Sequence, residues 1–247
     1  MPEIERPVLT IGALQPVGKA GILVDWAVLK KMGVHPTAAI SAVMIDDEYV
    51  EALSANLLVR ELNTFADTIK MEAVKVGHLV TRENMEAVAT FFEDNEHHVN
   101  HLVIDVSLES NEGTELISST AISLLKMRLL PIAEVAIAFP SEAKRLSGQG
   151  ASTIEEMKEA AEAIFLYGSK NVLVRSDKLI EGEWVDVLYD GSEHHLIYGK
   201  EEPKIDLRKY RDVYCSALAV YLLERGRSVS DACEQALKFI NSYRIPV

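Results

Sequence analysis

The polar side chains best suited to bind a ligand stand directly after segments that read as buried strands. They are Asp46, His78, Asp105, Glu142 and Arg175, and a loop, Gly12–Gly21, follows the first such segment. In a parallel sheet, ligands lie beyond the carboxyl ends of the strands, where these groups would meet. Carboxylates, an imidazole and a guanidinium could there bind a small polar molecule, although Asp46 and His78 are equally compatible with solvated loops.

A second candidate lies at the start of a late helix, at Asp212-Val213-Tyr214-Cys215. A helix N-terminus could favour the thiolate of Cys215. The alternative is a core cysteine that begins an apolar helix face. A turn that binds phosphate there would normally contain glycines, which let backbone N–H groups converge on an anion. Bulky residues and a carboxylate occupy this turn instead.

Three histidines, His97, His98 and His101, suggest a metal site, because the last two are three residues apart. A metal site needs fixed geometry and supporting hydrogen bonds. This stretch reads as a loop that enters a strand, so we assign no metal ligand.

Short apolar strands alternate with helices along the whole chain. We expect strands at 7–14, 38–45, 74–79, 101–106, 135–139, 171–175, 184–189 and 194–198. We expect helices at 20–32, 50–70, 83–92, 120–130, 153–167, 215–225 and 230–242. This order predicts an α/β fold, with a mostly parallel central sheet covered by helices on both faces. Asp190-Gly191 predicts a hairpin at one sheet edge, and residues 1–247 are expected to form a single domain.

The composition narrows the class of partner. A formal charge of −13 disfavours nucleic acid and anionic membranes, which both reward clustered Lys and Arg. The two cysteines, Cys215 and Cys233, suit a reducing compartment. No apolar run approaches the length of a membrane span, and the N-terminus has no basic segment followed by a cleavage site. A cytoplasmic protein is therefore expected.

Several segments, in order, resemble the hydroxymethylpyrimidine/phosphomethylpyrimidine kinase family of the ribokinase superfamily. The resemblance covers nearly the whole chain. It rests on the order and spacing of the matching segments, since no single segment is specific to the family. The segments are Thr10–Asp25, Gly33–Ala42, Met71–Gly77 (MEAVKVG), Pro140–Gly148 (PSEAKRLSG), Asn171–Val174 and Asp186–Gly191. The resemblance implies a three-layer ribokinase-like domain, a homodimer, and an ATP-dependent kinase of hydroxymethylpyrimidine or its phosphate that uses Mg²⁺ in thiamine biosynthesis.

The resemblance also implies a role for each candidate. Cys215 aligns with the catalytic residue, and Asp212 could be a replacement base. Gly12, Asp46 and His78 would contact the substrate. Asp105, Glu142 and Arg175 would lie on the cofactor side.

The chain departs from the family pattern mainly on the phosphate side. The family segment GTGC becomes Asp212–Cys215, the glycines of KGGH become Ser176 and Asp177, and an asparagine near the metal and phosphates becomes Phe139. Asp212 and Asp177 would also add negative charge there.

Two hypotheses follow from these departures. The first is a kinase with an impaired phosphate site. The second is a non-catalytic descendant that binds a small molecule, or nothing, and acts through contacts within an oligomer. The small-molecule partner expected from the resemblance is a heteroaromatic alcohol or its phosphate. If the turn is the main defect, replacing Asp212-Val213-Tyr214 by Gly-Thr-Gly should restore an anion pocket.

Overall fold

The computed structural model describes residues 6–46, 49–95, 99–109, 115–199 and 206–244, and its strands form one sheet. The strand order is β3-β2-β1-β4-β5-β6-β7-β8-β9. The strands are β1 (Pro7–Leu14), β2 (His35–Met44), β3 (Val50–Ala52), β4 (Ala73–Val76), β5 (His101–Asp105), β6 (Val135–Ala138), β7 (Val172–Val174), β8 (Val185–Tyr189) and β9 (His194–Tyr198). The helices are α1 (Ile22–Lys31), α2 (Ala55–Thr68), α3 (Arg82–Asp94), α4 (Ser119–Leu124), α5 (Pro140–Ser147), α6 (Ile154–Phe165), α7 (Arg211–Leu222) and α8 (Val229–Ser242).

The sheet is mostly parallel, as the sequence predicts. The strands β2, β1, β4, β5, β6 and β7 run parallel to their neighbours, so their carboxyl ends share one edge. The hairpin β8–β9 turns at Asp190-Gly191, and β9 is the outermost strand, which confirms the predicted edge hairpin. Two antiparallel pairs, β2 with β3 and β7 with β8, were not predicted.

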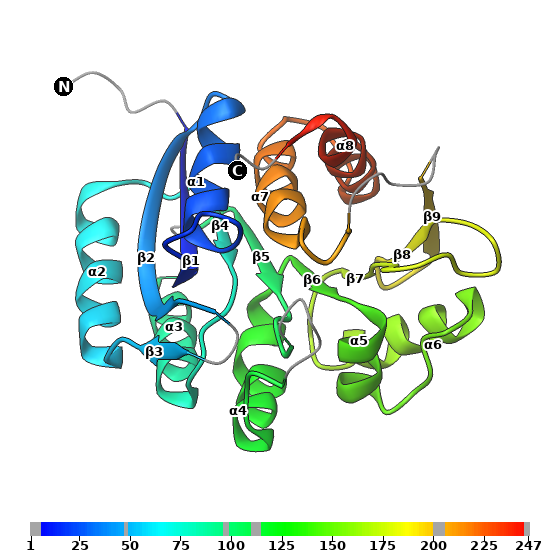
Figure 1. Cartoon of the computed structure of the whole chain (residues 1–247), viewed down its shortest axis with the longest axis horizontal. Coiled ribbons are helices and arrows are strands. Elements are labelled where there is room, and N and C mark those ends of the chain that lie inside the picture. The colour runs from blue at the N-terminus through cyan, green and yellow to red at the C-terminus, as the bar shows by residue number, and fades with distance from the viewer. Residues whose placement is uncertain (1–5, 47–48, 96–98, 110–114, 200–205, 245–247) are drawn as a thin grey trace.

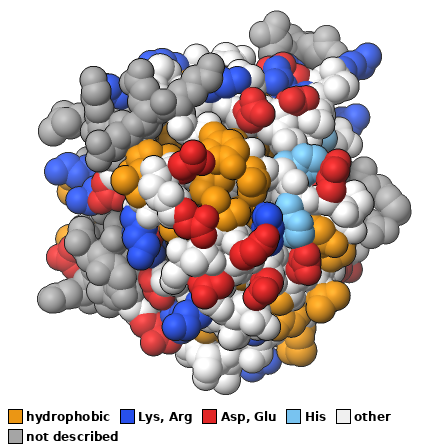
Figure 2. Space-filling model, turned by 90° about the vertical axis from the view of Figure 1, so that its right-hand side faces the viewer, with side chains coloured by type: hydrophobic (Ala, Val, Ile, Leu, Met, Phe, Trp, Pro, Cys, Tyr) orange, Lys and Arg blue, Asp and Glu red, His pale blue; other side chains and the backbone are white. Residues whose placement is uncertain are grey.

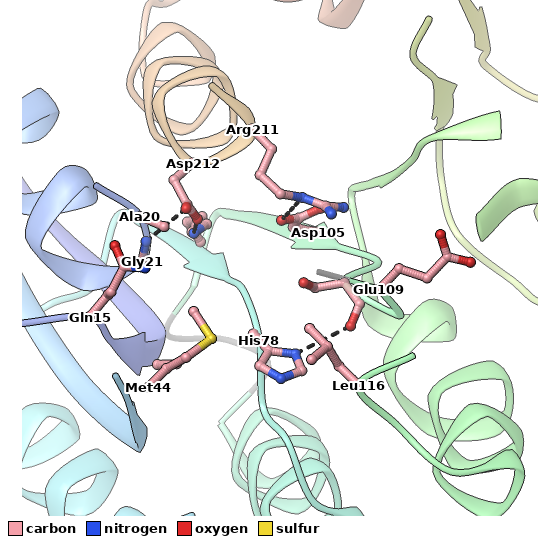
Figure 3. A pocket seen from close by; sticks show the side chains of 13 residues that line it. Gln15, Ala20, Gly21, Met44, His78, Asp105, Glu109, Leu116, Arg211 and Asp212 are labelled. Atoms are coloured by element: carbon pink, nitrogen blue, oxygen red, sulfur yellow. Dashed lines mark hydrogen bonds and ion pairs between the residues drawn. The ribbon is translucent and has the colours of Figure 1, made fainter. Parts of the chain in front are cut away.

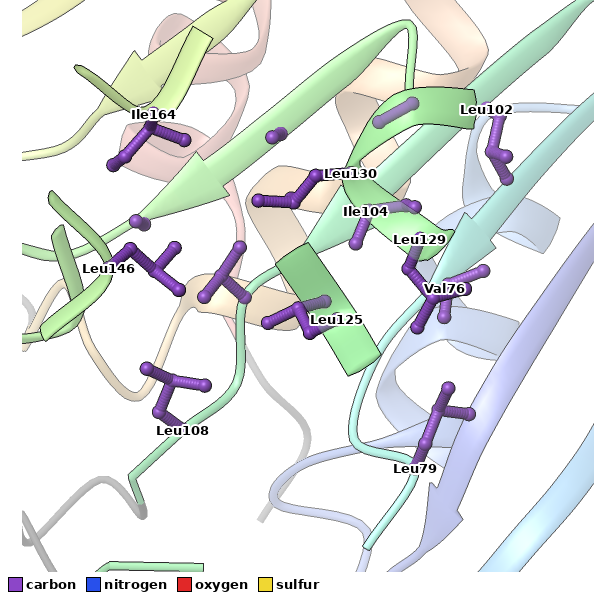
Figure 4. Packing of buried hydrophobic residues seen from close by; sticks show 14 of the residues in the cluster. Val76, Leu79, Leu102, Ile104, Leu108, Leu125, Leu129, Leu130, Leu146 and Ile164 are labelled. Atoms are coloured by element: carbon purple, nitrogen blue, oxygen red, sulfur yellow. The ribbon is translucent and has the colours of Figure 1, made fainter. Parts of the chain in front are cut away.

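Helices cover both faces of the sheet, and this gives three layers (Figure 1). One face carries α1, α7 and α8, and the other carries α2 to α6. Side chains of a strand alternate between faces. In β5, for example, Leu102 and Ile104 join the cluster with α2 to α6, whereas Val103 joins the cluster with α1, α7 and α8. Figure 4 shows Ile104 in the first cluster with Leu125, Leu129 and Leu130.

Several boundaries differ from the sequence-based expectation. The expected helix 50–70 is a short strand, β3, followed by α2, because Ser54 caps the helix by accepting a hydrogen bond from the Leu57 N–H at 3.3 Å. The expected helix 120–130 is α-helical only to Leu124, widens to a π-helix over Leu125–Leu129, and ends in a 3₁₀ turn at Leu130–Ile132 that contains Pro131. Helix α5 was not predicted at all. Helix α7 begins at Arg211, one turn earlier than the expected Cys215.

Surface charge follows the composition. The side of the molecule that carries β9 shows many carboxylates with single basic side chains between them, and the coloured residues form no basic stripe on that face (Figure 2). Across the described ranges, no helix combines the length and the apolar character that a membrane span requires.

Candidate functional site

A pocket lies at the carboxyl edge of the sheet, where the loops after β1, β2, β4 and β5 meet the start of α7 (Figure 3). Its free volume is about 60 Å³, well below the 300–1,000 Å³ typical of drug-sized ligands. In this conformation the pocket has room for a small fragment only. Its lining consists of Ala13, Gln15, Ala20, Gly21, Met44, Lys75, His78, Asp105, Ser107, Glu109, Leu116, Arg211 and Asp212.

The structure brings three of the predicted site residues, His78, Asp105 and Asp212, into this lining. It does not bring the others there. Gly12 lies behind the lining, and a Cβ at this position would lie 3.5 Å from the His78 backbone nitrogen. Asp46 is exposed in the turn after β2, where its Oδ1 accepts a hydrogen bond from the Tyr49 N–H at 2.8 Å. Met44, two residues earlier, lines the pocket in its place.

At the inner wall of the pocket, Lys75 forms a buried ion triad with two aspartates. Its Nζ lies 3.0 Å from Asp25 Oδ2 and 2.6 Å from Asp212 Oδ1. Burial alone would lower the pKa of Lys75, but attraction by Asp212 and Asp25 outweighs it and raises that pKa. Lys75 is therefore a fixed cation, and it is neither a base nor a nucleophile at neutral pH.

The pKa values of the two aspartates of the triad are shifted in opposite directions. Burial raises the pKa of Asp25 to about 6, although Lys75 opposes this, and its carboxylate also accepts hydrogen bonds from Thr10 at 2.5 Å and Ser216 at 2.7 Å. Burial would also raise the pKa of Asp212, but Lys75 and the Gly21 N–H, at 2.7 Å, lower it overall. Asp212 is thus the ionised carboxylate that this triad presents to the pocket.

A second buried ion cluster closes the pocket on the other side. The guanidinium of Arg211 contacts both oxygens of Asp105, at 3.0 and 2.8 Å, and Glu142 Oε2 at 2.9 Å. Glu142 also accepts hydrogen bonds from the Leu108 and Phe139 N–H groups, at 3.1 and 2.9 Å. Burial raises the pKa of Glu142 against the opposing effect of Arg211. Asp105 and Glu142, which were both expected on the cofactor side, therefore lie close together, but both bind Arg211 of the same chain.

The first turn of α7 is regular helix and has no phosphate-binding turn. The Tyr214 N–H donates to the Tyr210 carbonyl at 3.0 Å, so it is used within the chain. The Tyr214 ring is fully buried, and the guanidinium carbon of Arg175 lies 3.6 Å from the ring centroid. Arg175 is itself buried and binds Asp186 through Nε at 3.0 Å. Arg175 does not line the pocket, so the structure gives no support to its predicted cofactor role.

Cys215 is fully buried and does not line the pocket. Burial raises the pKa of its thiol well above the usual range. A neutral thiol without solvent contact is a poor base. The core-cysteine alternative thus fits the structure, and the catalytic reading does not.

Asp212 and Asp177 do not add the uncompensated negative charge that the sequence led us to expect on the phosphate side. Asp212 pairs with Lys75, and Asp177 pairs with Arg208 at 2.9 Å. Both carboxylates have a cation partner, so repulsion of an anion is weaker than the sequence suggested. At the position of the family's glycine turn, this chain has a continuous helix whose first-turn side chains are buried.

His78 is a lining residue with one buried ring nitrogen that has no hydrogen-bond partner. Its Nδ1 lies 3.3 Å from the Ser107 carbonyl oxygen, while its Nε2 is enclosed and has no hydrogen-bond partner. Burial lowers the pKa of His78 to about 4, so the ring is neutral at pH 7. Since a carbonyl oxygen can only accept, the proton of the neutral ring lies on Nδ1, and Nε2 is an acceptor.

The histidine stretch gives no metal site among the described residues. His101 pairs with Glu134 at 2.7 Å, at the amino end of β5, and His97 and His98 lie outside the described residues. Ligand atoms of Asp190, Glu193 and His195 at the hairpin turn come within 4.8 Å of one another. His195 already bonds Asp190 at 2.8 Å, so these groups satisfy one another.

The residue most clearly missed by sequence reasoning is Lys75. A signal was present, because a lysine inside the buried strand Ala-Val-Lys-Val must have an anionic partner. The apolar lining residues Met44 and Leu116 carried no comparable signal, since both read as ordinary core or loop positions.

Comparison with known proteins agrees with this architecture. The phosphomethylpyrimidine kinase family matches residues 15–244. The hydroxymethylpyrimidine/phosphomethylpyrimidine kinase of Aquifex aeolicus is 29% identical over 240 residues, which is 94% of this chain and 91% of that protein. The thiamine biosynthesis bifunctional protein ThiED of Geobacter sulfurreducens is 28% identical over 242 residues, 95% of this chain, but the chain spans only 48% of that protein's length.

Among solved structures, the phosphomethylpyrimidine kinase of Clostridium difficile superposes with a TM-score of 0.83. The superposition covers 96% of this chain and 99% of that one at 24% identity, which shows a shared ribokinase-like fold. Since the family match extends over most of the chain, the protein belongs to the phosphomethylpyrimidine kinase family.

Proposed function

We propose that this protein is a phosphomethylpyrimidine kinase-like protein with an impaired phosphate site. It binds a small heteroaromatic alcohol in the pocket between β1, β4 and α7 and transfers phosphate to it slowly or not at all. The first turn of α7 carries this proposal, because Tyr214 and Arg175 fill the interior behind it and the Tyr214 N–H bonds within the helix.

The side chains present do not fit a nucleotide with Mg²⁺. Magnesium prefers carboxylate oxygens in octahedral geometry. Asp105 and Glu142 are the nearest such pair, but Arg211 Nη2 lies 2.8 Å from Asp105 Oδ1 and 2.9 Å from Glu142 Oε2. A metal ion would have to displace a buried guanidinium from both carboxylates.

One observation favours a second candidate, an active ATP-dependent kinase of hydroxymethylpyrimidine or its phosphate in thiamine biosynthesis. Asp212 lines the pocket with a lowered pKa, so it is an ionised carboxylate next to the ligand space. Such a group could take the proton of a substrate hydroxyl. In this candidate ATP and Mg²⁺ are the cofactors, and Arg211 must leave Asp105 before the reaction.

We expect no sub-micromolar binding of ATP–Mg²⁺ in titration calorimetry, because no described cradle of glycine N–H groups faces the pocket. The same protein is expected to bind 5-hydroxymethylpyrimidine alcohols, and this is the positive control. Sub-micromolar nucleotide affinity together with ADP release in the presence of the alcohol would contradict the impaired site and establish the second candidate.

The proposed assembly is a homodimer in the cytoplasm, with no nucleic acid or membrane partner. Large hydrophobic side chains are exposed in the loops after β1 and β2: Val17 is 65% exposed, Ile45 48% and Tyr49 62%. We expect light scattering at micromolar concentration to give twice the 27.4 kDa chain mass. Ile45→Asp combined with Tyr49→Ser should give a monomer, whereas Leu166→Asp, at an exposed position outside these loops, should leave the dimer intact. A monomeric parent protein would refute the proposal.

A further inference from the structure

A second cavity lies at the amino edge of the sheet, opposite the edge that carries the first pocket. Its lining includes Leu102 at the amino end of β5, Glu134 directly before β6 and Lys170 two residues before β7. The first pocket is lined instead by Asp105, at the carboxyl end of β5. Three residues along a strand span about 10 Å, so the two cavities are separate.

The second cavity has the size and the apolar floor of a small-molecule site. Its free volume is about 370 Å³, within the range of roughly 300–1,000 Å³ that is typical of ligand pockets. Among its lining residues, Phe92 and Leu102 are buried members of the core cluster with α2 to α6, and Val99 and Ile132 pack against that cluster. A ligand that covers these side chains removes apolar surface from water, which favours binding.

Two hydrogen-bond donors on the rim have no protein partner within the described part of the chain. The Lys170 ammonium forms no ion pair there, and the Asn100 side-chain amide forms no hydrogen bond, although both residues line the cavity and are exposed. The acidic residue of the lining, Glu134, is already bound, since its Oε2 lies 2.7 Å from His101 Nδ1. Lys170 is therefore available to a ligand that carries an anionic acceptor.

The charge of the lining matches a singly charged anion. It contains one lysine and one glutamate. A phosphate monoester carries about −1.5 to −2 at pH 7, more than one ammonium can balance, and would place the excess close to Glu134. A carboxylate carries a single negative charge, and its two oxygens can accept hydrogen bonds from an ammonium and an amide at once.

We propose that the cavity at the amino edge of the sheet binds a small apolar monocarboxylate. The hydrocarbon or ring of this ligand covers Phe92 and Leu102, and its carboxylate accepts hydrogen bonds from Lys170 and Asn100. This site shares no residue with the first pocket, so the proposal does not depend on the proposed function.

The test is a titration of isotope-labelled protein with octanoate, octanol and octylammonium, followed by NMR. The probes share one hydrocarbon chain and differ in charge. We expect octanoate to shift the amide signals of Leu102 and Lys170 and to leave those of Asp105 and Asp212 in place. We expect it to bind at least about 5-fold more tightly than octanol, because hydrogen bonds to charged groups are the stronger ones, and octylammonium to bind most weakly.

Three variants separate the contribution of charge from that of the apolar floor. Lys170→Met keeps most of the side-chain length and should weaken octanoate about 5- to 10-fold while octanol binds as before. Lys144→Met, at an exposed lysine of α5, is the matched control and should bind every probe like the parent. Val99→Phe fills part of the cavity and should weaken octanoate and octanol together, and unchanged amide signals elsewhere would show that it is folded.

The site is overturned if the shifted signals centre on the first pocket or spread evenly over the surface, or if Val99→Phe binds octanoate like the parent. The carboxylate preference is overturned if octanol or octylammonium binds as tightly as octanoate, or if Lys170→Met leaves octanoate affinity unchanged. Absence of octanoate binding overturns the proposal as a whole. The proposed function would still stand, because it is tested with pyrimidine alcohols and ATP at the first pocket.

Discussion

Replacement of Lys75 by methionine is expected to destabilise the protein by about 3–5 kcal/mol, the range measured when one partner of a buried ion pair is removed. Methionine matches the length of the lysine chain, so packing is nearly retained. The loss comes from Asp25 and Asp212, which stay buried, at 1% and 8% relative exposure, without their common cation. Urea unfolding followed by circular dichroism measures this difference in the free energy of unfolding.

Lys158→Met is the matched control for this prediction. Lys158 pairs with Glu155 at 3.0 Å on the outside of α6, where ion pairs contribute about 1 kcal/mol or less. Adding Asp25→Asn to Lys75→Met should restore part of the stability, because it removes one of the two unpaired charges. If Lys75→Met were no more destabilising than Lys158→Met, the triad could not be the structural centre that its geometry indicates.

The second large effect is expected when Asp212-Val213-Tyr214 is replaced by Gly-Thr-Gly. From sequence alone this change was expected to restore an anion pocket. The structure reverses that expectation, because these residues form the first turn of α7 and Tyr214 is fully buried. Removing a buried aromatic side chain costs about 3–5 kcal/mol, and each helical glycine about 1 kcal/mol more. The loss of Asp212 also leaves Lys75 with Asp25 alone.

The sum approaches the whole stability of a typical domain, about 5–15 kcal/mol, so a largely unfolded variant is expected. Circular dichroism and thermal unfolding test this directly. The same replacement at Val229-Ser230-Asp231, in the partly exposed first turn of α8, should lower stability by only about 2 kcal/mol, the propensity difference of two glycines. A stable Gly-Thr-Gly variant at 212–214 that binds ATP would show that this turn was the main defect after all.

The sequence was sufficient for the fold because the fold depends on local patterns. Apolar strands such as HLVID and the turn Asp190-Gly191 specify their own conformation, and the alternation with helices fixes a parallel sheet. The boundaries that failed depended on capping and on tertiary contacts. For instance, residues 50–52 pair with β2 as strand β3, and the Ser54 cap sets the start of α2 after them.

The site was only partly predictable, since its contacts join residues distant in the chain. The rule that ligands lie beyond strand ends indicated His78, Asp105 and the loop Gly12–Gly21, and the first two and part of the loop line the pocket. The partners of Lys75 and Arg211 could not be predicted, because Lys75 and Asp212 are 137 positions apart and Arg211 and Asp105 are 106 apart. No local pattern specifies such pairs.

The triad also bears on the order in which the protein can fold during synthesis. Thr10, Asp25 and Lys75 belong to the first third of the chain, whereas Asp212 and Ser216 come near its end. At about 5–20 residues per second, the ribosome makes Lys75 roughly 7–27 s before Asp212. Through that interval strands β1 and β4 can pair, but the face that α7 later covers presents Lys75 with only one of its two aspartates. The nascent sheet therefore stays open on this side until the chain is nearly complete, and this is the period in which a chaperone would have most to protect.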